Sequence, residues 1–194
     1  MIIGITGFKQ SGKDSVAKIL RLRHAHRVYG MADPMYMMMA VGLGIASEDV
    51  VEAGRIDLSV LNRLGVSIRV MYDKEEIIPE YGCSLRHIMQ TLGTEWGREL
   101  ISKEVWITRF GAWRDRNGYP EYVAIPDVRF DNEALAIREM GGVMIEVRRP
   151  DMDGGDAHSS ESGINTELID HVIDNDCCKS ILMAKVDSLL AELK

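Results

Sequence analysis

The chain has few cysteines, no long apolar run and no excess of positive charge. Its three cysteines, two of them adjacent at Cys177 and Cys178, fit neither a disulfide framework nor zinc-ligand spacing. No run approaches the roughly 18 uncharged apolar residues of a membrane span, and MIIGITG lacks the layout of a signal peptide. The net charge of −7 speaks against a nucleic-acid polymer as partner, since that requires a basic surface. We therefore expect a cytoplasmic protein that binds no membrane.

The 194 residues, 46% of them hydrophobic, suit one globular domain with an insertion. Short apolar runs predict strands, and runs with helical spacing predict helices. The expected strands are 2–6, 122–125, 143–147 and 172–173, and the expected helices are 15–23, 85–91, 132–140 and 180–193. Residues 34–110 read as mostly helical, with a hairpin over 66–78. Strands that alternate with helices predict an α/β fold with a parallel sheet.

The sharpest motif is Gly7-Phe8-Lys9-Gln10-Ser11-Gly12-Lys13, which satisfies G-x-x-x-x-G-K between a predicted strand and a predicted helix. Glycines let successive backbone N–H groups point at one phosphate, and the helix N-terminus adds partial positive charge. Lys13 adds a full charge near the β- and γ-phosphates. A glycine-rich turn with an incidental lysine is the alternative.

Asp14 follows Lys13, where Ser or Thr usually supplies a hydroxyl to Mg²⁺, and Ser15 comes next. A carboxylate can bind Mg²⁺ directly or through water, but it would repel the phosphates without the metal. Asp14 is therefore either a metal ligand or the mark of an altered loop geometry.

A second acidic group, Asp127, stands at the carboxyl end of the strand predicted over 122–125. Ligands of open α/β sheets bind at that edge, where an Asp can hold Mg²⁺ through water. Arg129, two residues on, either binds a phosphate or forms a structural pair with a carboxylate.

Five segments carry a family resemblance. They are G-F-K-Q-S-G-K-D-S at the phosphate loop, A-D-P over 32–34, R-H-I-M-Q-T-L-G-T-E-W-G-R over 86–98, P-D-V-R-F-D-N-E over 126–133, and V-I-D-N-D over 172–176. Together they resemble the phage deoxynucleoside monophosphate kinases of the P-loop nucleoside monophosphate kinase family.

The resemblance implies a single domain over 1–194 with a P-loop NTPase three-layer αβα fold and a parallel sheet. The core of that domain would be formed by about 1–32, 121–148 and 169–194. It also implies a helical monophosphate-binding insertion over about 33–120 and a lid over about 149–168. The implied activity is transfer of the ATP γ-phosphate to a deoxynucleoside monophosphate with Mg²⁺, in the host cytoplasm if the protein is phage-encoded.

Matching by position assigns roles to residues. ATP would be held by Gly7, Gln10, Ser11, Gly12, Lys13, Asp14 and Ser15, with Mg²⁺ on Asp14 and Asp127. The monophosphate would be held by Lys9, Asp33, Arg86, Gln90, Trp106, Arg129 and Glu133. The catalytic set would be Lys13, Asp127, Arg129, Arg148 and Arg149. A helix cap is the alternative for Asp33, and core packing is the alternative for Trp106.

Arg148 and Arg149 close a predicted strand just before the polar segment 150–163. Arginines of a closing lid would neutralise the transferred phosphoryl group and exclude water; a solvated basic strand end is the alternative. For His158 in that segment we favour a structural or lid-closing role over acid–base catalysis.

Two other functions stay open. One is a different small-molecule P-loop kinase, such as a dephospho-coenzyme A or phosphomevalonate kinase. The other is a nucleotide-binding module that transfers nothing. The base preference, the choice between deoxyribose and ribose, and a homodimeric state also stay open.

Overall fold

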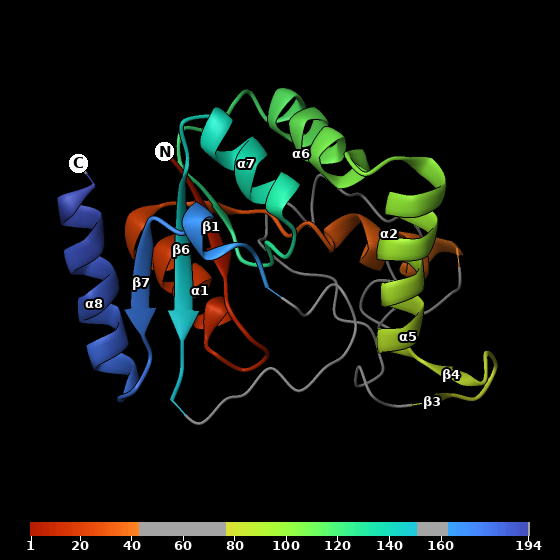
Figure 1. Cartoon of the computed structure of the whole chain (residues 1–194), viewed down its shortest axis with the longest axis horizontal. Helices are drawn as coiled ribbons and strands as arrows, with labels where there is room; N and C mark the ends of the chain where they lie inside the picture. The colour runs from red at the N-terminus through yellow and green to blue at the C-terminus, as the bar shows by residue number, and fades with distance from the viewer. Residues whose placement is uncertain (43–76, 151–162, 194) are drawn as a thin grey trace. The chain divides into compact units, whose positions relative to one another are not determined.

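The computed structural model describes residues 1–42, 77–150 and 163–193 (Figure 1). The chain forms two compact units. Unit 1 consists of Met1–Gly30 and Phe110–Lys194, and unit 2 consists of Met31–Arg109. No helix in the described ranges combines the length and the apolar character needed to cross a membrane.

Unit 1 is built on a five-stranded sheet in which every pairing is parallel. Its order is β2 (Arg27–Val28), β5 (Val123–Ile125), β1 (Ile2–Thr6), β6 (Val143–Arg148) and β7 (His171–Asp174). All five residues of β1 are buried, which explains its unbroken apolar sequence, because a central parallel strand is covered on both faces. Since the strands are parallel, their carboxyl ends lie at one edge of the sheet.

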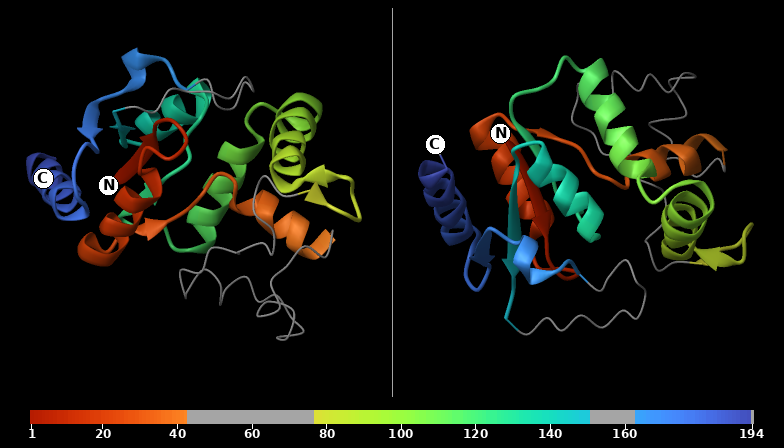
Figure 2. Two further views of the ribbon diagram at one scale, coloured as in Figure 1. Left: turned by 90° about the horizontal axis from the view of Figure 1, so that it is seen from below. Right: turned by 45° about the horizontal axis from the view of Figure 1, so that its top comes forward.

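Helices cover both faces of this sheet, so unit 1 has three layers (Figure 2). On one face, α1 (Lys13–His24) and α8 (Lys179–Glu192) pack against Ile3 and Ile5 of β1. On the other face lies α7 (Asp131–Glu139), whose Ile137 approaches Gly4 so closely that a Cβ there would stand 2.9 Å from the Ile137 methyl group. The predicted α/β fold and the predicted strands and helices of this unit are confirmed, with ends shifted by a few residues.

Strand β2 is absent from the sequence prediction, and its structure explains why. Arg27 and Val28 are both exposed and pair only at the sheet edge, with Val123 and Ala124. Two exposed residues have neither the length nor the apolar pattern that marks a strand. Sequence patterning alone therefore cannot reveal this edge.

Helix α6 (Val105–Arg116) begins in unit 2 and ends in unit 1. Its Phe110 and Trp113 pack on Tyr29 of unit 1, with ring centroids 5.0 and 4.9 Å from the tyrosine ring. Aromatic burial of this kind joins α6 from Phe110 onward to unit 1. The insertion expected over about 33–120 stays a prediction.

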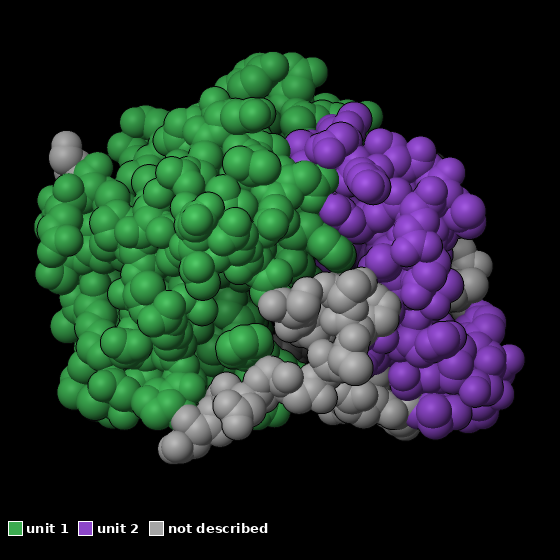
Figure 3. Space-filling model, viewed as in Figure 1, with its two compact units in different colours: residues 1–30, 110–194 green, residues 31–109 purple. Residues whose placement is uncertain are grey.

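Figure 3 colours unit 2 purple, and the residues of this unit that the structure describes, 31–42 and 77–109, form helices and one short hairpin. Unit 2 contains α2 (Asp33–Gly42), β3 (Ile77–Ile78), β4 (Cys83–Ser84), α5 (Leu85–Gln90) and a π-helical stretch, Thr91–Ile101. The Ser84 hydroxyl accepts a hydrogen bond from the His87 N–H at 3.2 Å and so caps the N-terminus of α5.

The hairpin differs from the one predicted over 66–78. Ile77 and Ile78 pair with Ser84 and Cys83, which follow them in the chain. Gly82, with φ 65°, provides the left-handed turn between the strands. Residues 66–76 lie outside the described ranges, as do His158 and most of the predicted lid.

Buried His26 leads to a prediction about pH. Its Nδ1 donates to the His24 carbonyl at 3.1 Å, its Nε2 is buried without a hydrogen-bond partner, and its ring packs on Tyr122. Burial lowers the pKa of His26 from its ordinary 6.5, and the charges of His24 and the N-terminal amine lower it further. The unfolded chain therefore binds this proton more readily, and stability is lost as pH falls below about 6.5.

We expect the Tm to fall between about pH 7.5 and about pH 5.5, and to fall less in His26→Phe, which keeps a ring against Tyr122 but cannot titrate. Thermal unfolding at both pH values measures this. An equal fall in the two proteins would contradict the assignment to His26.

Candidate active site

The segment between β1 and α1 has the backbone of a phosphate-binding loop. Gly7 has φ 137° and Gly12, the residue before α1, has φ 107°, a region that L side chains rarely adopt. The Ser11 N–H donates to the Phe8 carbonyl at 3.2 Å, which closes the turn. A Cβ on Gly7 would meet the Val147 carbonyl oxygen, so the loop lies directly against the end of β6.

Lys13, the first residue of α1, holds its ammonium group over this loop. Its Nζ donates to the Gly7 carbonyl at 2.5 Å and to the Phe8 carbonyl at 2.6 Å. These two bonds set a positive charge beside backbone N–H groups at the N-terminus of a 12-residue helix. The loop can therefore offer both full and partial positive charge to an anion.

Asp127 belongs to the same edge of the sheet. It follows the end of β5 by two residues, and the N–H of the next residue, Val128, donates to the Ile5 carbonyl of β1 at 3.2 Å. That bond keeps the segment after β5 beside the strand that enters the phosphate loop. Asp127 and the loop are therefore placed at the end of neighbouring strands, as the sequence predicts.

The turn after Asp127 is fixed by Glu133. Its carboxylate is buried, with only 2% of the residue exposed, and accepts hydrogen bonds from the N–H groups of Arg129 at 2.9 Å and Phe130 at 3.3 Å. The expectation that Glu133 binds a substrate stays a prediction. In this structure the carboxylate holds the backbone that carries Arg129 at the start of α7.

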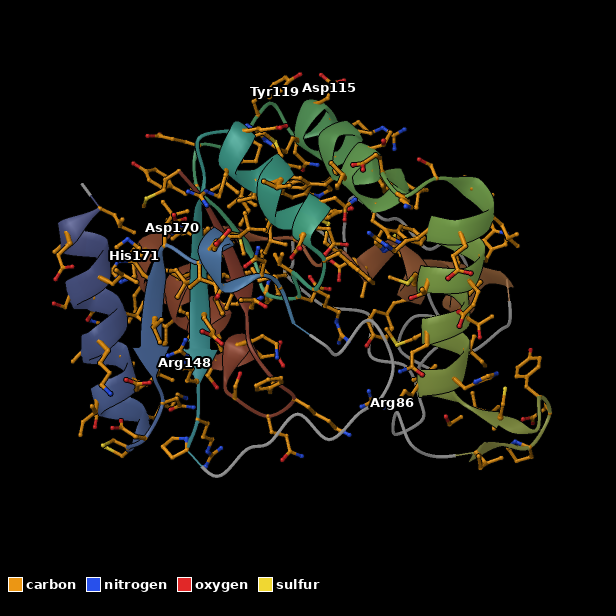
Figure 4. The ribbon with its side chains drawn as sticks, viewed as in Figure 1. Arg86, Asp115, Tyr119, Arg148, Asp170 and His171 are labelled. Carbon is orange, nitrogen blue, oxygen red and sulfur yellow. The ribbon has the colours of Figure 1, made fainter. Side chains whose placement is uncertain are left out.

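Arg148 ends β6 at the carboxyl edge of the sheet, as Figure 4 shows. Its guanidinium pairs with Glu146, with Nε and Nη2 standing 2.8 and 2.6 Å from Oε2. This partner raises the pKa of Arg148 above its ordinary value. Arg149 follows in an exposed position. The pairing with Glu146 is a feature that the sequence prediction did not include.

Of the remaining predicted residues, Lys9 and Gln10 lie in the phosphate loop and Ser15 lies in the first turn of α1, all in unit 1. The other four belong to unit 2. Asp33 opens α2. Arg86, which is labelled in Figure 4, and Gln90 are half-buried on α5, four positions apart and therefore on one face of that helix. Trp106 is 5% exposed, and its Nε1 donates to the Gly93 carbonyl at 2.8 Å. The geometry of Trp106 suits packing inside unit 2, which was its alternative interpretation.

The acidic residues of unit 1 suit a metal ion that arrives with a nucleotide. Mg²⁺ keeps several waters and uses one or two carboxylates together with phosphate oxygens. Asp14, exposed in the first turn of α1, and Asp127 are carboxylates at the edge where the loop lies. Among the described residues, no group of three or more His, Cys, Asp or Glu side chains could hold a metal ion by itself.

Sequence reasoning assigned no role to Asn175, which follows β7. Its Nδ2 donates to the Ser11 carbonyl of the phosphate loop at 2.8 Å. A polar residue directly after an apolar strand, in the quoted segment V-I-D-N-D, was the available signal. Its partner could not be predicted, because Ser11 lies 164 positions away.

A phosphate loop between the first strand and first helix, at the carboxyl edge of a parallel sheet with helices on both faces, defines the P-loop αβα fold. The family model described as deoxynucleotide monophosphate kinase matches residues 67–186. The chain therefore belongs to the deoxynucleotide monophosphate kinase family.

Three curated relatives are viral proteins. The deoxynucleotide monophosphate kinases of Enterobacteria phage T4 and Escherichia phage RB69 are 34% and 32% identical over 113 and 109 residues, which are 57% and 55% of this chain. These matches span 46% and 45% of the two relatives, so the chain spans about half of their length. The deoxynucleoside-5'-monophosphate kinase of Escherichia phage T5 is 25% identical over 90% of this chain and 89% of its own length.

Two solved structures align with nearly the whole chain. A shikimate kinase from Aquifex aeolicus gives a TM-score of 0.45 at 16% identity, covering 100% of this chain and 96% of its own. A dephospho-CoA kinase from Campylobacter jejuni gives a TM-score of 0.46 at 10% identity, covering 99% and 96%.

Proposed function

We propose that this protein transfers the γ-phosphoryl group of ATP to a deoxynucleoside monophosphate, forming ADP and a deoxynucleoside diphosphate. The observation that carries the proposal is the Lys13 ammonium held over a strand–loop–helix phosphate cradle. Membership of the deoxynucleotide monophosphate kinase family supports the choice of acceptor. The proposal places the protein where ATP and monophosphates occur together, in the cytoplasm of a host cell.

ATP is proposed to bind with its β- and γ-phosphates on the loop from Gly7 to Gly12. Backbone N–H groups and the Lys13 ammonium neutralise the phosphate oxygens, and the N-terminus of α1 adds its partial charge. Asp14 and Asp127, with the Ser15 hydroxyl, would hold Mg²⁺, which when bound draws charge from the phosphate oxygens. The residues of the chain would therefore contribute by positioning the phosphates and by neutralising their charge.

The reaction exchanges one P–O bond for another. A phosphate oxygen of the acceptor forms a bond to the γ-phosphorus, while the bond to the β–γ bridging oxygen breaks and ADP leaves with those electrons. The acceptor oxygen is already anionic near neutral pH, since the second pKa of a phosphomonoester is about 6. A strong base is therefore not required, which agrees with the absence of one from our proposed catalytic set.

The acceptor-binding residues that the family resemblance implies are Lys9, Arg86, Gln90 and Arg129. Arginines suit this task because their planar guanidinium groups bind phosphate through two hydrogen bonds. Arg149, and Arg148 once it exchanges Glu146 for phosphate, would neutralise the transferred group. In the structure the partner of the Arg148 guanidinium is the Glu146 carboxylate, which the phosphate would replace.

The test is ADP formation from Mg·ATP with each common deoxynucleoside and nucleoside monophosphate assayed separately. We expect ADP to form with one or a few deoxynucleoside monophosphates and not with the matching nucleosides, which lack the acceptor phosphate. ATP binding without acceptor-dependent ADP formation would contradict the proposal. Activity with dephospho-coenzyme A or phosphomevalonate instead would identify a different kinase.

A further inference from the structure

The turn between β7 and α8 is hydrogen-bonded to the phosphate loop. The Asn175 side chain donates through Nδ2 to the Ser11 carbonyl at 2.8 Å, and its backbone N–H donates to the Arg148 carbonyl at 2.7 Å. A Cβ on Gly12 would meet the same side-chain amide. Asn175 therefore lies against the Ser11–Gly12 peptide and is fixed to the end of β6.

The geometry of a peptide group turns this contact into a constraint on the loop. In a planar trans peptide the C=O and N–H bonds point in opposite directions. Because Asn175 holds the Ser11 carbonyl, the Gly12 N–H of the same peptide is directed away from Asn175. If this peptide rotated, the carbonyl oxygen would turn toward the side where phosphates bind and would repel them.

The loop sequence itself does not prevent that rotation. Gly12 has φ 107° and lacks a Cβ, and glycine crosses between backbone regions at little steric cost. The turn that carries Asn175 is itself held, since Lys185 of α8 donates to the Asp174 carbonyl at 2.5 Å and to the Asp176 carboxylate at 2.7 Å. The Ser11–Gly12 peptide, which glycine leaves free to rotate, is thus hydrogen-bonded to a side chain whose own turn is held by Lys185.

We infer that Asn175 is a positioning residue for nucleotide binding, which keeps the Gly12 N–H turned toward the phosphates by holding the Ser11 carbonyl on the opposite side. The inference rests on the proposed ATP site. Asn175 itself touches no phosphate in this arrangement, so its effect reaches the nucleotide through the loop backbone.

The experiment compares the wild type, Asn175→Ala and Asn117→Ala. Asn117 is a matched control outside the proposed site, because its Nδ2 also donates to a backbone carbonyl at 2.8 Å, that of Trp113. Calorimetric titration with Mg·ADP gives the nucleotide affinity, steady-state kinetics give KM for ATP and for the acceptor, and thermal unfolding gives Tm.

In Asn175→Ala we expect about fivefold to tenfold weaker ADP binding, the effect of one lost hydrogen bond, with a similar rise in KM for ATP. KM for the acceptor stays unchanged, and Asn117→Ala binds ADP like the wild type. ADP affinity within about twofold of the wild type would overturn the inference, since it leaves no room for a bond of this strength.

Failure of this inference and failure of the proposed function give different results. A wild type that binds Mg·ADP but phosphorylates no monophosphate contradicts the proposed function, and the affinity of Asn175→Ala then still decides the role of Asn175. A wild type that binds no ADP overturns both. Equal losses of affinity in Asn175→Ala and Asn117→Ala would reduce the effect to general destabilisation and overturn the inference alone.

Discussion

Lys13→Ala is expected to lower kcat/KM for ATP by about 10²–10³-fold, the effect of removing one charged donor from a developing phosphoryl transition state. The Lys13 ammonium has two loop carbonyls as acceptors, those of Gly7 and Phe8. An ammonium group carries a full positive charge and three N–H donors, and we expect a bound phosphate oxygen to accept a hydrogen bond from it. Alanine removes the charge and all three donors.

The matched control is Lys18→Ala, which removes a lysine from an exposed position of the same helix. We expect it to retain wild-type kinetics, because a surface charge on α1 does not face the loop. ADP formation assayed with the best acceptor, alongside Tm for each variant, separates loss of chemistry from loss of folding. Full activity in Lys13→Ala would end the proposal that residues 7–15 form the ATP site.

Gly7→Ala is expected to abolish detectable nucleotide binding and to lower the free energy of unfolding by about 3 kcal/mol, roughly 6–12 °C in Tm for a domain of this size. Two causes act together. An L residue at φ 137° is strained, and the added Cβ would meet the Val147 carbonyl and stand 2.9 Å from Ser11 Oγ. The Val147 carbonyl belongs to the backbone of β6 in the central sheet, so the loop must move away from it.

Gly141→Ala separates these two causes. Gly141 has φ 74°, and a Cβ there would have nothing within 4 Å. It ends α7, away from the phosphate loop, so this variant carries backbone strain alone, about 1–2 kcal/mol. We expect a smaller fall in Tm and unchanged ADP affinity. Equal destabilisation in the two variants would contradict the role of the Val147 contact.

Much of the proposed site in unit 1 could be predicted because its determinants are local. The two glycines and Lys13 stand within seven consecutive residues, so their arrangement depends on one turn and the start of one helix. The position of Asp127 could also be predicted, since a residue next to the end of an apolar strand lies at the edge of the sheet. The common feature is that short chain segments fix these geometries.

The partners of other predicted site residues could not be predicted from the sequence, because each side chain has several chemically equivalent partners along the chain. Arg148 pairs with Glu146, and Glu133 caps its own helix. The resemblance assigned Arg148 to the catalytic set and Glu133 to monophosphate binding. A sequence shows that a carboxylate and a guanidinium are present, but their distances depend on strand pleating and helix entry. The kinase roles of these two residues stay predictions.

The sequence by itself determined the phosphate loop, the strand and helix on either side of it, and the α/β class, because hydrophobic period and glycine conformation act over a few residues. Only the tertiary structure decided which strands are neighbours, and therefore that Asn175 meets Ser11 across 164 positions. The physical reason is that strand order depends on the packing of two helix layers on the sheet. No local preference of either residue contains that information.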